Sequence, residues 1–229
     1  MSKKRLLFLF VLFDALVGGA ILLLLFTPIG HRVRVAVFGG QTVEQRIEEF
    51  GSRAQATWLS RFADAGVQYP PRSLALVADK SQRVLHVYAG AKFVCTLPIV
   101  EMSGELGPKL AEGDRQVPEG VYEIESLNPN SAYHVSLRVN YPNDVDREAG
   151  STGSDIMIHG KDRSIGCLAM GDPAAEQLFF LADLVGIDNI EVLLCPVDFR
   201  VAEHEATTPL ERDKYDRLRI RLARLEAVP

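Results

Sequence analysis

A nearly unbroken apolar run from Leu6 to Phe26 is the feature that most limits how this chain can fold. Only Asp14 and two glycines interrupt it, and a helix of this length can cross the hydrocarbon core of a bilayer. The basic residues Lys3 to Arg5 precede the run and favour a cytoplasmic N-terminus. The run ends without an A-x-A-like cleavage site, which favours an uncleaved transmembrane helix over a signal peptide. Secretion after cleavage is the alternative.

Charge is divided unevenly along the chain. Residues 1–40 hold five Lys or Arg and one Asp, while the whole chain has a net charge of −5. The part after residue 40 is therefore strongly acidic and lacks the basic footprint that binding to nucleic acid needs. A peptide substrate remains compatible with this charge. Apart from Cys167, the cysteines are Cys95 and Cys195 in apolar runs, where a buried free thiol is the simplest account.

The order of predicted elements indicates a β-rich α+β fold preceded by the transmembrane helix. Apolar residues at helical spacing predict an amphipathic helix over 42–64, and Tyr69-Pro70-Pro71 ends that region. Strands are expected at 73–78, 84–89, 92–100, 121–127, 133–141, 156–158 and 189–194. Helices are expected at 174–185, with Asp172 as N-cap, and at 209–225, as a solvated helix packed along one side. A long loop is expected over 103–120 and a turn at Asn128–Ser131. These elements predict four regions: a basic tip and anchor (1–40), a helical linker (41–70), a β-rich domain (71–200) and a helical tail (201–229).

The segment Asp155–Met170, DIMIHGKDRSIGCLAM, holds the residues that indicate chemistry. Its apolar start predicts a short strand ending at His159, and a polar turn leads from there to Cys167. Such a turn can bring an imidazole beside a thiol, and the imidazole then removes the thiol proton or stabilises the thiolate that attacks a carbonyl. Gly166 lets the backbone turn tightly, so that amide N–H groups beside Cys167 can face a developing oxyanion.

Each of these residues also has a simpler interpretation. A lone cysteine is most often a small buried hydrophobic residue, and a lone histidine is usually structural. Other cysteine chemistries fit less well: Pro173 stands where a phosphatase loop needs arginine, and Met170 excludes a C-x-x-C redox motif. His159 and Cys167 lack the paired ligand spacing of a zinc site, so we expect neither a metal nor another cofactor.

Together, His-Gly followed by Ser-x-Gly-Cys resembles the active-site signature of the L,D-transpeptidase family with a YkuD-type catalytic domain. The runs HG-SIGCLAM and NPNSAYHVSLRVNYPN resemble its YafK-like branch more narrowly. The resemblance spans residues 73 to 200. It implies a YkuD-like β-sandwich with flanking helices, a loop flap over the cysteine, and a peptidoglycan substrate in the bacterial cell envelope. With the anchor, it implies an inner-membrane protein whose catalytic domain lies in the periplasm.

The resemblance also implies a mechanism. His159 activates Cys167, which attacks the carbonyl at the L-centre of a diamino acid in a stem peptide and forms a thioester. An incoming amine then yields a crosslink, whereas water yields hydrolysis. Gly166, Ser164 and Gly160 would support the loop and the oxyanion. An envelope module that binds peptidoglycan without turnover is the alternative, and it predicts a buried, unreactive Cys167.

Two positions depart from the broader family pattern. Ile165 replaces the second histidine of Ser-His-Gly-Cys, and Ala169 stands where many members have an arginine that can hold a carboxylate. Both features suit the YafK-like branch and leave open cleavage of the bond between peptidoglycan and an attached lipoprotein. His134 and Tyr133 belong to the second run that resembles this branch, and we expect them near the substrate site.

Overall fold

The computed structural model describes residues 12–21 and 27–228. The chain divides into two compact units, Met1–Gln41 and Thr42–Pro229. In the first unit residues 12–21 are helical, and helix α2 spans Pro28–Phe38. Apart from residues 12–21, the expected transmembrane helix over 6–26 lies outside the described residues. Within the described ranges, no helix is both long and apolar enough to cross a bilayer.

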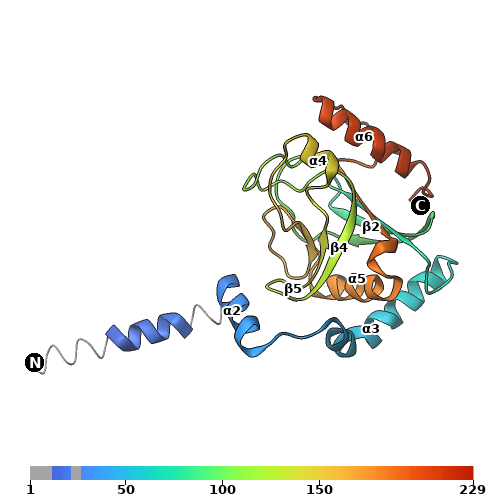
Figure 1. Cartoon of the computed structure of the whole chain (residues 1–229). Coiled ribbons are helices and arrows are strands. Elements are labelled where there is room, and N and C mark those ends of the chain that lie inside the picture. Colours follow the sequence, from blue (N-terminus) through green and yellow to red (C-terminus); the bar gives the residue numbers. More distant parts are fainter. Residues whose placement is uncertain (1–11, 22–26, 229) are drawn as a thin grey trace, which may run out of the picture. The chain divides into compact units, whose positions relative to one another are not determined.

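The second unit is built on one eight-stranded sheet with the order β3-β2-β1-β8-β4-β5-β6-β7 (Figure 1). The strands are β1 (Leu74–Asp79), β2 (Val84–Ala89), β3 (Lys92–Pro98), β4 (Gly120–Ser131), β5 (His134–Val139), β6 (Met157–His159), β7 (Leu168–Ala169) and β8 (Ile190–Cys195). The long strand β4 pairs with β8 through residues 120–123 and with β5 through residues 124–131. The α+β class is confirmed, and the curled sheet with flanking helices fits the YkuD-like fold that the resemblance implied.

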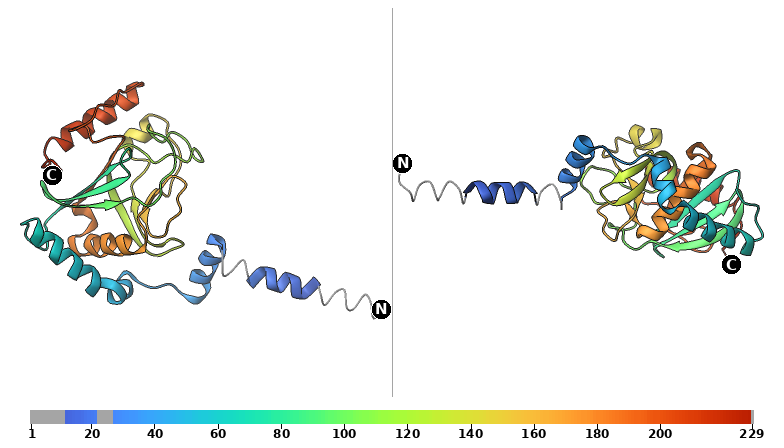
Figure 2. Two further views of the ribbon diagram at one scale, coloured as in Figure 1. Left: turned by 180° about the vertical axis from the view of Figure 1, so that it is seen from behind. Right: turned by 90° about the horizontal axis from the view of Figure 1, so that it is seen from below.

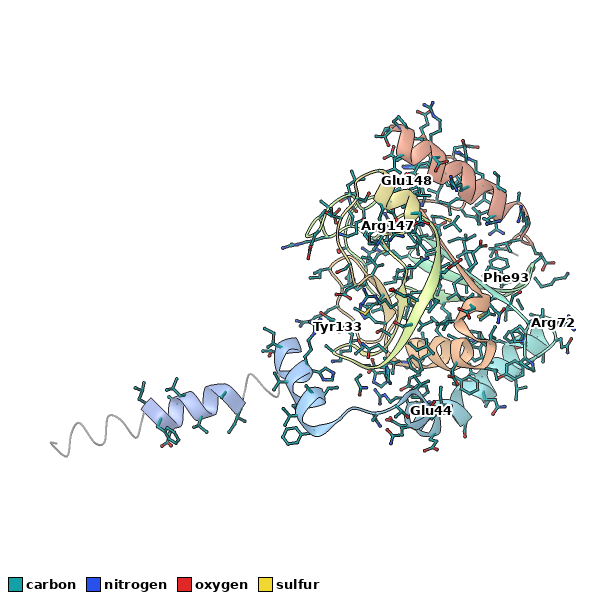
Figure 3. The ribbon with its side chains drawn as sticks, viewed as in Figure 1. Glu44, Arg72, Phe93, Tyr133, Arg147 and Glu148 are labelled. Carbon is teal, nitrogen blue, oxygen red and sulfur yellow. The ribbon has the colours of Figure 1, made fainter. Side chains whose placement is uncertain are left out.

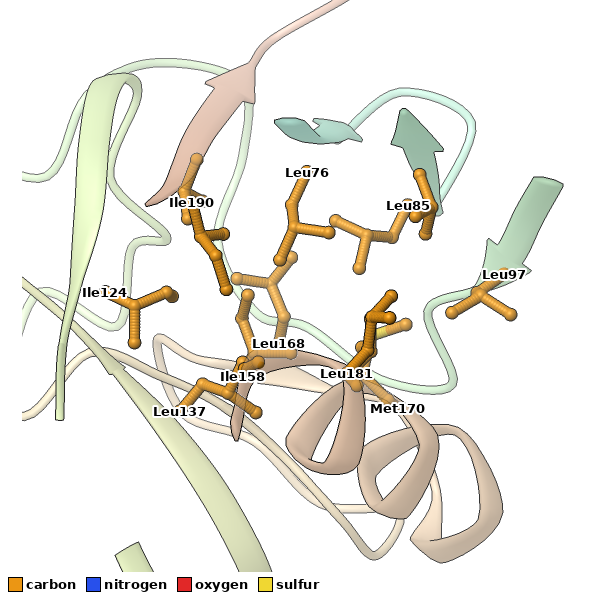
Figure 4. Packing of buried hydrophobic residues seen from close by; sticks show 14 of the residues in the cluster. Leu76, Leu85, Leu97, Ile124, Leu137, Ile158, Leu168, Met170, Leu181 and Ile190 are labelled. Atoms are coloured by element: carbon orange, nitrogen blue, oxygen red, sulfur yellow. The ribbon is translucent and has the colours of Figure 1, made fainter. Parts of the chain in front are cut away.

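Helices cover both faces of the central strands, as the views in Figure 2 show. Because side chains alternate along a strand, β1 and β8 bury one set of residues on each face. Leu76 and Val192 belong to the core that includes α3 (Val43–Asp64) and α5 (Asp172–Val185). Val77 and Leu193 belong to the core under α6 (Pro209–Leu222). Figure 4 shows the first core, in which leucines and isoleucines of the sheet meet Leu181 of α5.

The apolar stripe predicted over residues 42–64 is confirmed as helix α3. Its N-cap Thr42 and Gln45 form a capping box, which satisfies amide groups that a helix start leaves free. Trp58 is fully buried, and its indole Nε1–H donates to the carbonyl of Gln177 in α5 at 2.8 Å. The amphipathic helix is therefore fixed to the second helix that packs on the same face of the sheet.

Two local predictions are wrong. Asn128–Ser131 was expected to form a turn, but β4 runs to Ser131, and the chain reverses at Ala132 and Tyr133. This half of β4 pairs only with β5, so the missing N–H of Pro129 is tolerated at an edge. The second wrong prediction made Asp172 the N-cap of α5, whereas Gly171 occupies that position.

The remaining elements are short. Helix α4 spans Asp144–Glu148, and a 3-10 turn, η1, spans Ile187–Asn189. Residues 103–119 contain neither helix nor strand, in agreement with the long loop expected there. We call residues 103–119 the flap loop. The flap loop runs beside the segment that carries Cys167. A Cβ placed on Gly166 would lie 3.3 Å from the carbonyl oxygen of Gln116 in this loop.

Candidate active site

Strands β6 and β7 bring His159 and Cys167 to one face of the sheet. They pair in parallel, with the register Ile158↔Leu168 and His159↔Ala169. Extending this register by one residue sets Cys167 beside Met157. Side chains alternate along strands, so His159 and Cys167 both project from the face opposite Ile158 and Leu168, which are buried in the core. The imidazole and the thiol are therefore diagonal neighbours.

His159 has Nδ1 engaged, and the described residues provide no hydrogen bond to its Nε2. Its side chain is buried, and Nδ1 lies 2.6 Å from the carbonyl oxygen of Gly160. A carbonyl can only accept, so Nδ1 carries the proton and Nε2 keeps its lone pair. Burial lowers the pKa of His159, and the charge of Lys161 lowers it further, although the hydrogen bond to Gly160 opposes both. The ring is thus suited to accept a proton at Nε2 near neutral pH.

Tyr133 packs against this imidazole. The two ring centroids lie 4.6 Å apart with the planes tilted by 37°. Tyr133 sits where the chain turns between β4 and β5 (Figure 3). Gly160 makes this approach possible: a Cβ there would lie 2.5 Å from Asp172 Oδ1 and 2.9 Å from the carbonyl of Tyr133. The glycine after His159 is required by packing, since any side chain would push the turn away.

Ser164 shapes the turn that carries the cysteine. Its Oγ accepts a hydrogen bond from the Cys167 N–H at 2.8 Å and donates one to the Cys167 carbonyl at 2.7 Å. Gly166 adopts a φ of +120°, which is costly for residues with a Cβ. Next to it, the Ile165 side chain is 74% exposed. The loop is thus fixed by its own hydrogen bonds and by contact with the flap loop.

The Cys167 thiol is half-buried and protonated at rest. Its Sγ donates to the carbonyl of Asp155 at 3.4 Å, and it makes no hydrogen bond to His159. Burial raises the pKa of the thiol to about 11, and the charge of Asp155 acts in the same direction. At neutral pH the acid and the base therefore share one face of the sheet without forming an ion pair.

The backbone amides next to Cys167 differ in availability. The sequence pointed to the N–H groups of Gly166 and Cys167 as donors to an oxyanion. The Cys167 N–H is occupied by Ser164 Oγ. Among the residues that the structure describes, the Gly166 N–H has no acceptor. Gly166 is thus the donor that is free in this conformation.

His134 lies next to Tyr133 in sequence but makes a different set of contacts. Its Nε2 lies 2.9 Å from Glu176 Oε1 in α5, and its Nδ1 lies 3.2 Å from Arg46 Nη2 in α3. The structure therefore brings Tyr133 to His159, whereas the His134 imidazole is engaged by the two helices. Only one of the two candidate substrate-site residues touches the candidate base.

Sequence reasoning missed three charged residues around the thiol. Arg138 of β5 pairs in register with Met157, and its Nη1 lies 2.7 Å from Asp155 Oδ1. Lys109 of the flap loop is 5% exposed and pairs with Asp114. Its positive charge opposes the rise that burial causes in the pKa of Cys167. The alternation within 134–139 could have indicated Arg138. Nothing in the local pattern indicated Lys109, because a loop has no period.

Comparison with known proteins identifies the family of the chain. Residues 73–192 match the model of the YkuD family, described as the L,D-transpeptidase catalytic domain. The chain belongs to this family, as its motif indicated. It is therefore a transpeptidase-type, peptidoglycan-modifying enzyme of the cell envelope, from a family that acts on stem peptides.

Individual relatives can be named. The chain is 30% identical over 172 residues to "Putative L,D-transpeptidase YafK" of Escherichia coli K12, which covers 72% of this chain and 68% of that protein. Among solved structures, the helical cell shape determining protein Pgp2 of Campylobacter jejuni matches with 23% identity and a TM-score of 0.47. That match covers 69% of this chain and 59% of Pgp2. L,D-transpeptidase 1 of Mycobacterium tuberculosis matches with 18% identity, a TM-score of 0.35 and coverages of 54% and 62%. The chain thus spans less than two thirds of either solved relative.

Proposed function

We propose that this chain is a cysteine acyltransferase that acts on peptidoglycan stem peptides, with Cys167 as nucleophile and His159 as its base. The observation that carries the proposal is the register of β6 and β7, which, extended by one residue to Cys167, puts both side chains on one face, with His159 Nδ1 engaged by Gly160. A base oriented by a hydrogen bond to its other nitrogen, next to a nucleophile, is the arrangement that covalent catalysis needs.

Proton transfer and attack must be coupled, because thiol and imidazole are both neutral at rest. Burial raises the pKa of Cys167 to about 11 and lowers the pKa of His159. His159 Nε2 takes the thiol proton while the sulfur leaves Asp155 and attacks the carbonyl carbon at the L-centre of the diamino acid. As the tetrahedral intermediate collapses to a thioester, the imidazolium gives its proton to the leaving amine.

The second half-reaction runs the same path in reverse. An amine or a water molecule gives a proton to His159 and attacks the thioester carbon, and the sulfur leaves and regains a proton. An amine produces a new amide crosslink, and water produces a free carboxylate. The Gly166 N–H is the proposed first donor to the oxyanion, and the Cys167 N–H joins it only when Ser164 releases it.

Crosslinking and hydrolysis are both proposed outcomes, and hydrolysis includes release of a protein attached to peptidoglycan. Ala169 and Ile165 support a substrate that differs from that of the broader family, since Ala169 offers no cation to a substrate carboxylate. The test is incubation with purified sacculi, followed by mass analysis of the muropeptides. New crosslinked dimers would identify a transpeptidase, and loss of attached peptide would identify a hydrolase.

The same assay tests the catalytic residues. Cys167→Ala should abolish every change in the muropeptides, and His159→Gln should lower it by about two to four orders of magnitude, as loss of a general base does. A carbapenem should add its mass to the intact protein at Cys167. If Cys167→Ala turned over sacculi normally, the assignment of the nucleophile would be wrong.

A second candidate is an envelope module that binds peptidoglycan without turnover. One observation favours it: the thiol donates to Asp155 and makes no hydrogen bond to His159. The module predicts sacculus binding by the folded domain with no thiol-probe label at Cys167. Labelling of Cys167, together with any Cys167-dependent change in muropeptides, would exclude it.

We also propose that residues 6–26 anchor the chain in the inner membrane with residues 42–229 in the periplasm. The apolar run and the basic residues before it support this. The full chain should remain in the membrane pellet after an alkaline wash, and its intact mass should include residue 6. A mature protein that begins after residue 26 would support secretion instead.

A further inference from the structure

A chain of polar contacts runs from helix α3 to the turn that carries Tyr133. In the first turns of α3, Arg46 Nε donates to the carbonyl of Pro129 at 3.1 Å, and its Nη2 donates to the carbonyl of His134 at 3.3 Å. The same Nη2 lies 3.2 Å from His134 Nδ1. One guanidinium therefore clamps the end of β4 and the start of β5, although it lies more than 80 residues away in sequence.

These contacts fix the tautomer of His134. A guanidinium is always protonated and can only donate, so His134 Nδ1 must accept from Arg46. The ring proton is then on Nε2, which donates to Glu176 Oε1 at 2.9 Å. The other carboxylate oxygen of Glu176 receives Arg53 Nη2 at 2.5 Å. Both helices that cover this face of the sheet thus contribute to one network around a neutral imidazole.

The backbone at His134 explains why such a network is needed. His134 has a φ of +78°, in the left-handed region that residues with a Cβ rarely adopt. Such a conformation is strained and persists only where the surroundings enforce it. It forms the sharp turn that directs Tyr133 and His134 to different neighbours. Tyr133 reaches the His159 ring on one side, and His134 reaches Arg46 and Glu176 on the other.

We propose that Arg46 and Glu176 are positioning residues for catalysis, which hold His134 in its left-handed conformation and so keep Tyr133 packed on His159. The proposal rests on the proposed role of His159 as the base. Arg46 of helix α3 lies outside residues 73–192, which match the family model. The proposed positioning contact therefore comes from a helix that the matched domain does not include. Small shifts in the position of His159 should matter, because a displacement of about 1 Å in a catalytic group can lower the rate about 100-fold.

The chain offers a matched control for Arg46. Arg61 lies on the same helix, and its Nη1 donates to Gln177 Oε1 of α5 at 2.8 Å. Arg61→Ala therefore removes a comparable contact between α3 and α5 but touches nothing next to Tyr133. Arg46→Ala and Arg61→Ala should lower the thermal midpoint similarly. Only Arg46→Ala should lower kcat on sacculi, by about tenfold or more, with KM little changed.

A second measurement does not depend on turnover. In the full chain with labelled histidine, the ring protons of His159 should show a ring-current shift that Tyr133→Leu removes. Arg46→Ala should move this signal toward its Tyr133→Leu position, and Arg61→Ala should leave it unchanged. Glu176→Gln, which keeps an acceptor for His134 Nε2–H, should have a smaller effect than Glu176→Ala. If Arg46→Ala failed to fold, Arg46→Lys would replace it, since lysine cannot supply both the Nε and Nη2 donors.

The outcomes separate the two proposals. An unchanged His159 signal and an unchanged kcat in folded Arg46→Ala, beside the expected loss in Cys167→Ala, would overturn the positioning role alone. Normal turnover by Cys167→Ala would overturn the proposed function, while the His159 signal would still report whether Arg46 holds Tyr133 in place.

Discussion

Ser164 Oγ accepts a hydrogen bond from the Cys167 N–H and donates one to the Cys167 carbonyl, at 2.8 and 2.7 Å. One hydroxyl thus satisfies both backbone groups of the candidate nucleophile. This closed turn sets the direction of the Cys167 side chain, and it also withholds the Cys167 amide from an oxyanion. The same contact therefore orients the sulfur and limits the number of donors around the reacting carbonyl.

Ser164→Ala tests this double role. It leaves the Cys167 N–H without its partner, so we expect the free energy of unfolding to fall by about 1 kcal/mol. We expect turnover of sacculi to fall at least tenfold because the thiol loses its orientation, and Ser164→Thr, which keeps a hydroxyl, to retain most of it. Urea unfolding and muropeptide analysis measure the two effects. Full activity in Ser164→Ala would make Ser164 an ordinary turn residue.

Gly160 gives a second prediction, because its φ is ordinary and only space decides the outcome. A Cβ at Gly160 would lie 2.5 Å from Asp172 Oδ1 and 2.9 Å from the Tyr133 carbonyl. We expect Gly160→Ala to lower the free energy of unfolding by about 1–3 kcal/mol, as overpacking does, and to displace Tyr133 from His159. Chemical denaturation measures the loss.

A double-mutant cycle with Asp172→Ala provides the control. Asp172→Ala removes the carboxylate that crowds the new methyl group, together with the hydrogen bond that Asp172 Oδ1 accepts from the Lys161 N–H at 2.7 Å. The double variant should be less destabilised than the sum of the single variants, and the remainder is due to the Tyr133 carbonyl and to His134 Cβ, which a Cβ at Gly160 would meet at 3.0 Å. Strict additivity would show that Asp172 is not the group that excludes a side chain at 160.

The sequence predicted well those parts of the fold and of the site that depend on contacts between residues close together in the chain. The strand over 84–89 and helix α3 were predicted within a residue, because period-two and 3.6-residue patterns record burial directly. A turn that can bring His159 beside Cys167 was predicted from a motif within one short segment, and their roles as base and nucleophile stay predictions. Strand β7 was not predicted, because its two residues are too few to show a period.

The rest of the site depends on distant partners. Asp172 was predicted as an N-cap from local chemistry, but the amide of Lys161 takes its carboxylate. The contact between Arg46 and His134 spans 88 residues and leaves no local pattern. The tail over 209–225 was expected to be a solvated helix packed along one side, and Tyr215 is buried on that side, but the burial of the charged Lys214 was not predicted. Such contacts become visible only when the chain is folded.

Tyr215 belongs to a buried network that supports the flap loop. Glu119 Oε1 accepts from Lys80 Nζ at 2.7 Å, and its Oε2 accepts from the Tyr215 hydroxyl at 2.7 Å. Lys80 also donates to the flap-loop carbonyls of Gly107 and Val117. The Lys80 and Glu119 side chains are at most 1% exposed, so water cannot replace a lost partner.

Glu119→Gln should therefore destabilise the fold strongly. It leaves the Lys80 ammonium buried without its counter-charge, and breaking a buried ion pair in this way costs about 3–5 kcal/mol. Tyr215→Phe should cost about 1–2 kcal/mol, because only one hydrogen bond is lost. The control is Asp213→Ala, which breaks the exposed pair with Arg217 and should cost at most about 1 kcal/mol. Equal losses in Glu119→Gln and Asp213→Ala, measured by urea unfolding, would contradict this account.

The opposite pKa shifts of Cys167 and His159 predict the pH dependence of thiol reactivity. Burial raises the thiol pKa to about 11 and lowers the pKa of the imidazole. Moving the thiol proton to the imidazole gives a thiolate with an imidazolium. The population of this ion pair does not change with pH between the pKa of His159 and the pKa of Cys167. If the His159 imidazolium stabilises the thiolate, alkylation by iodoacetamide should be slow below the His159 pKa, level over a range of pH just above it, and faster again toward pH 11. Without the base, in His159→Gln, the rate should rise about tenfold per pH unit until the thiol ionises, because only free thiolate reacts. The modified cysteine is identified by peptide mass, since Cys95 is also partly exposed. A native profile that matches His159→Gln at every pH would mean that His159 does not assist the thiol.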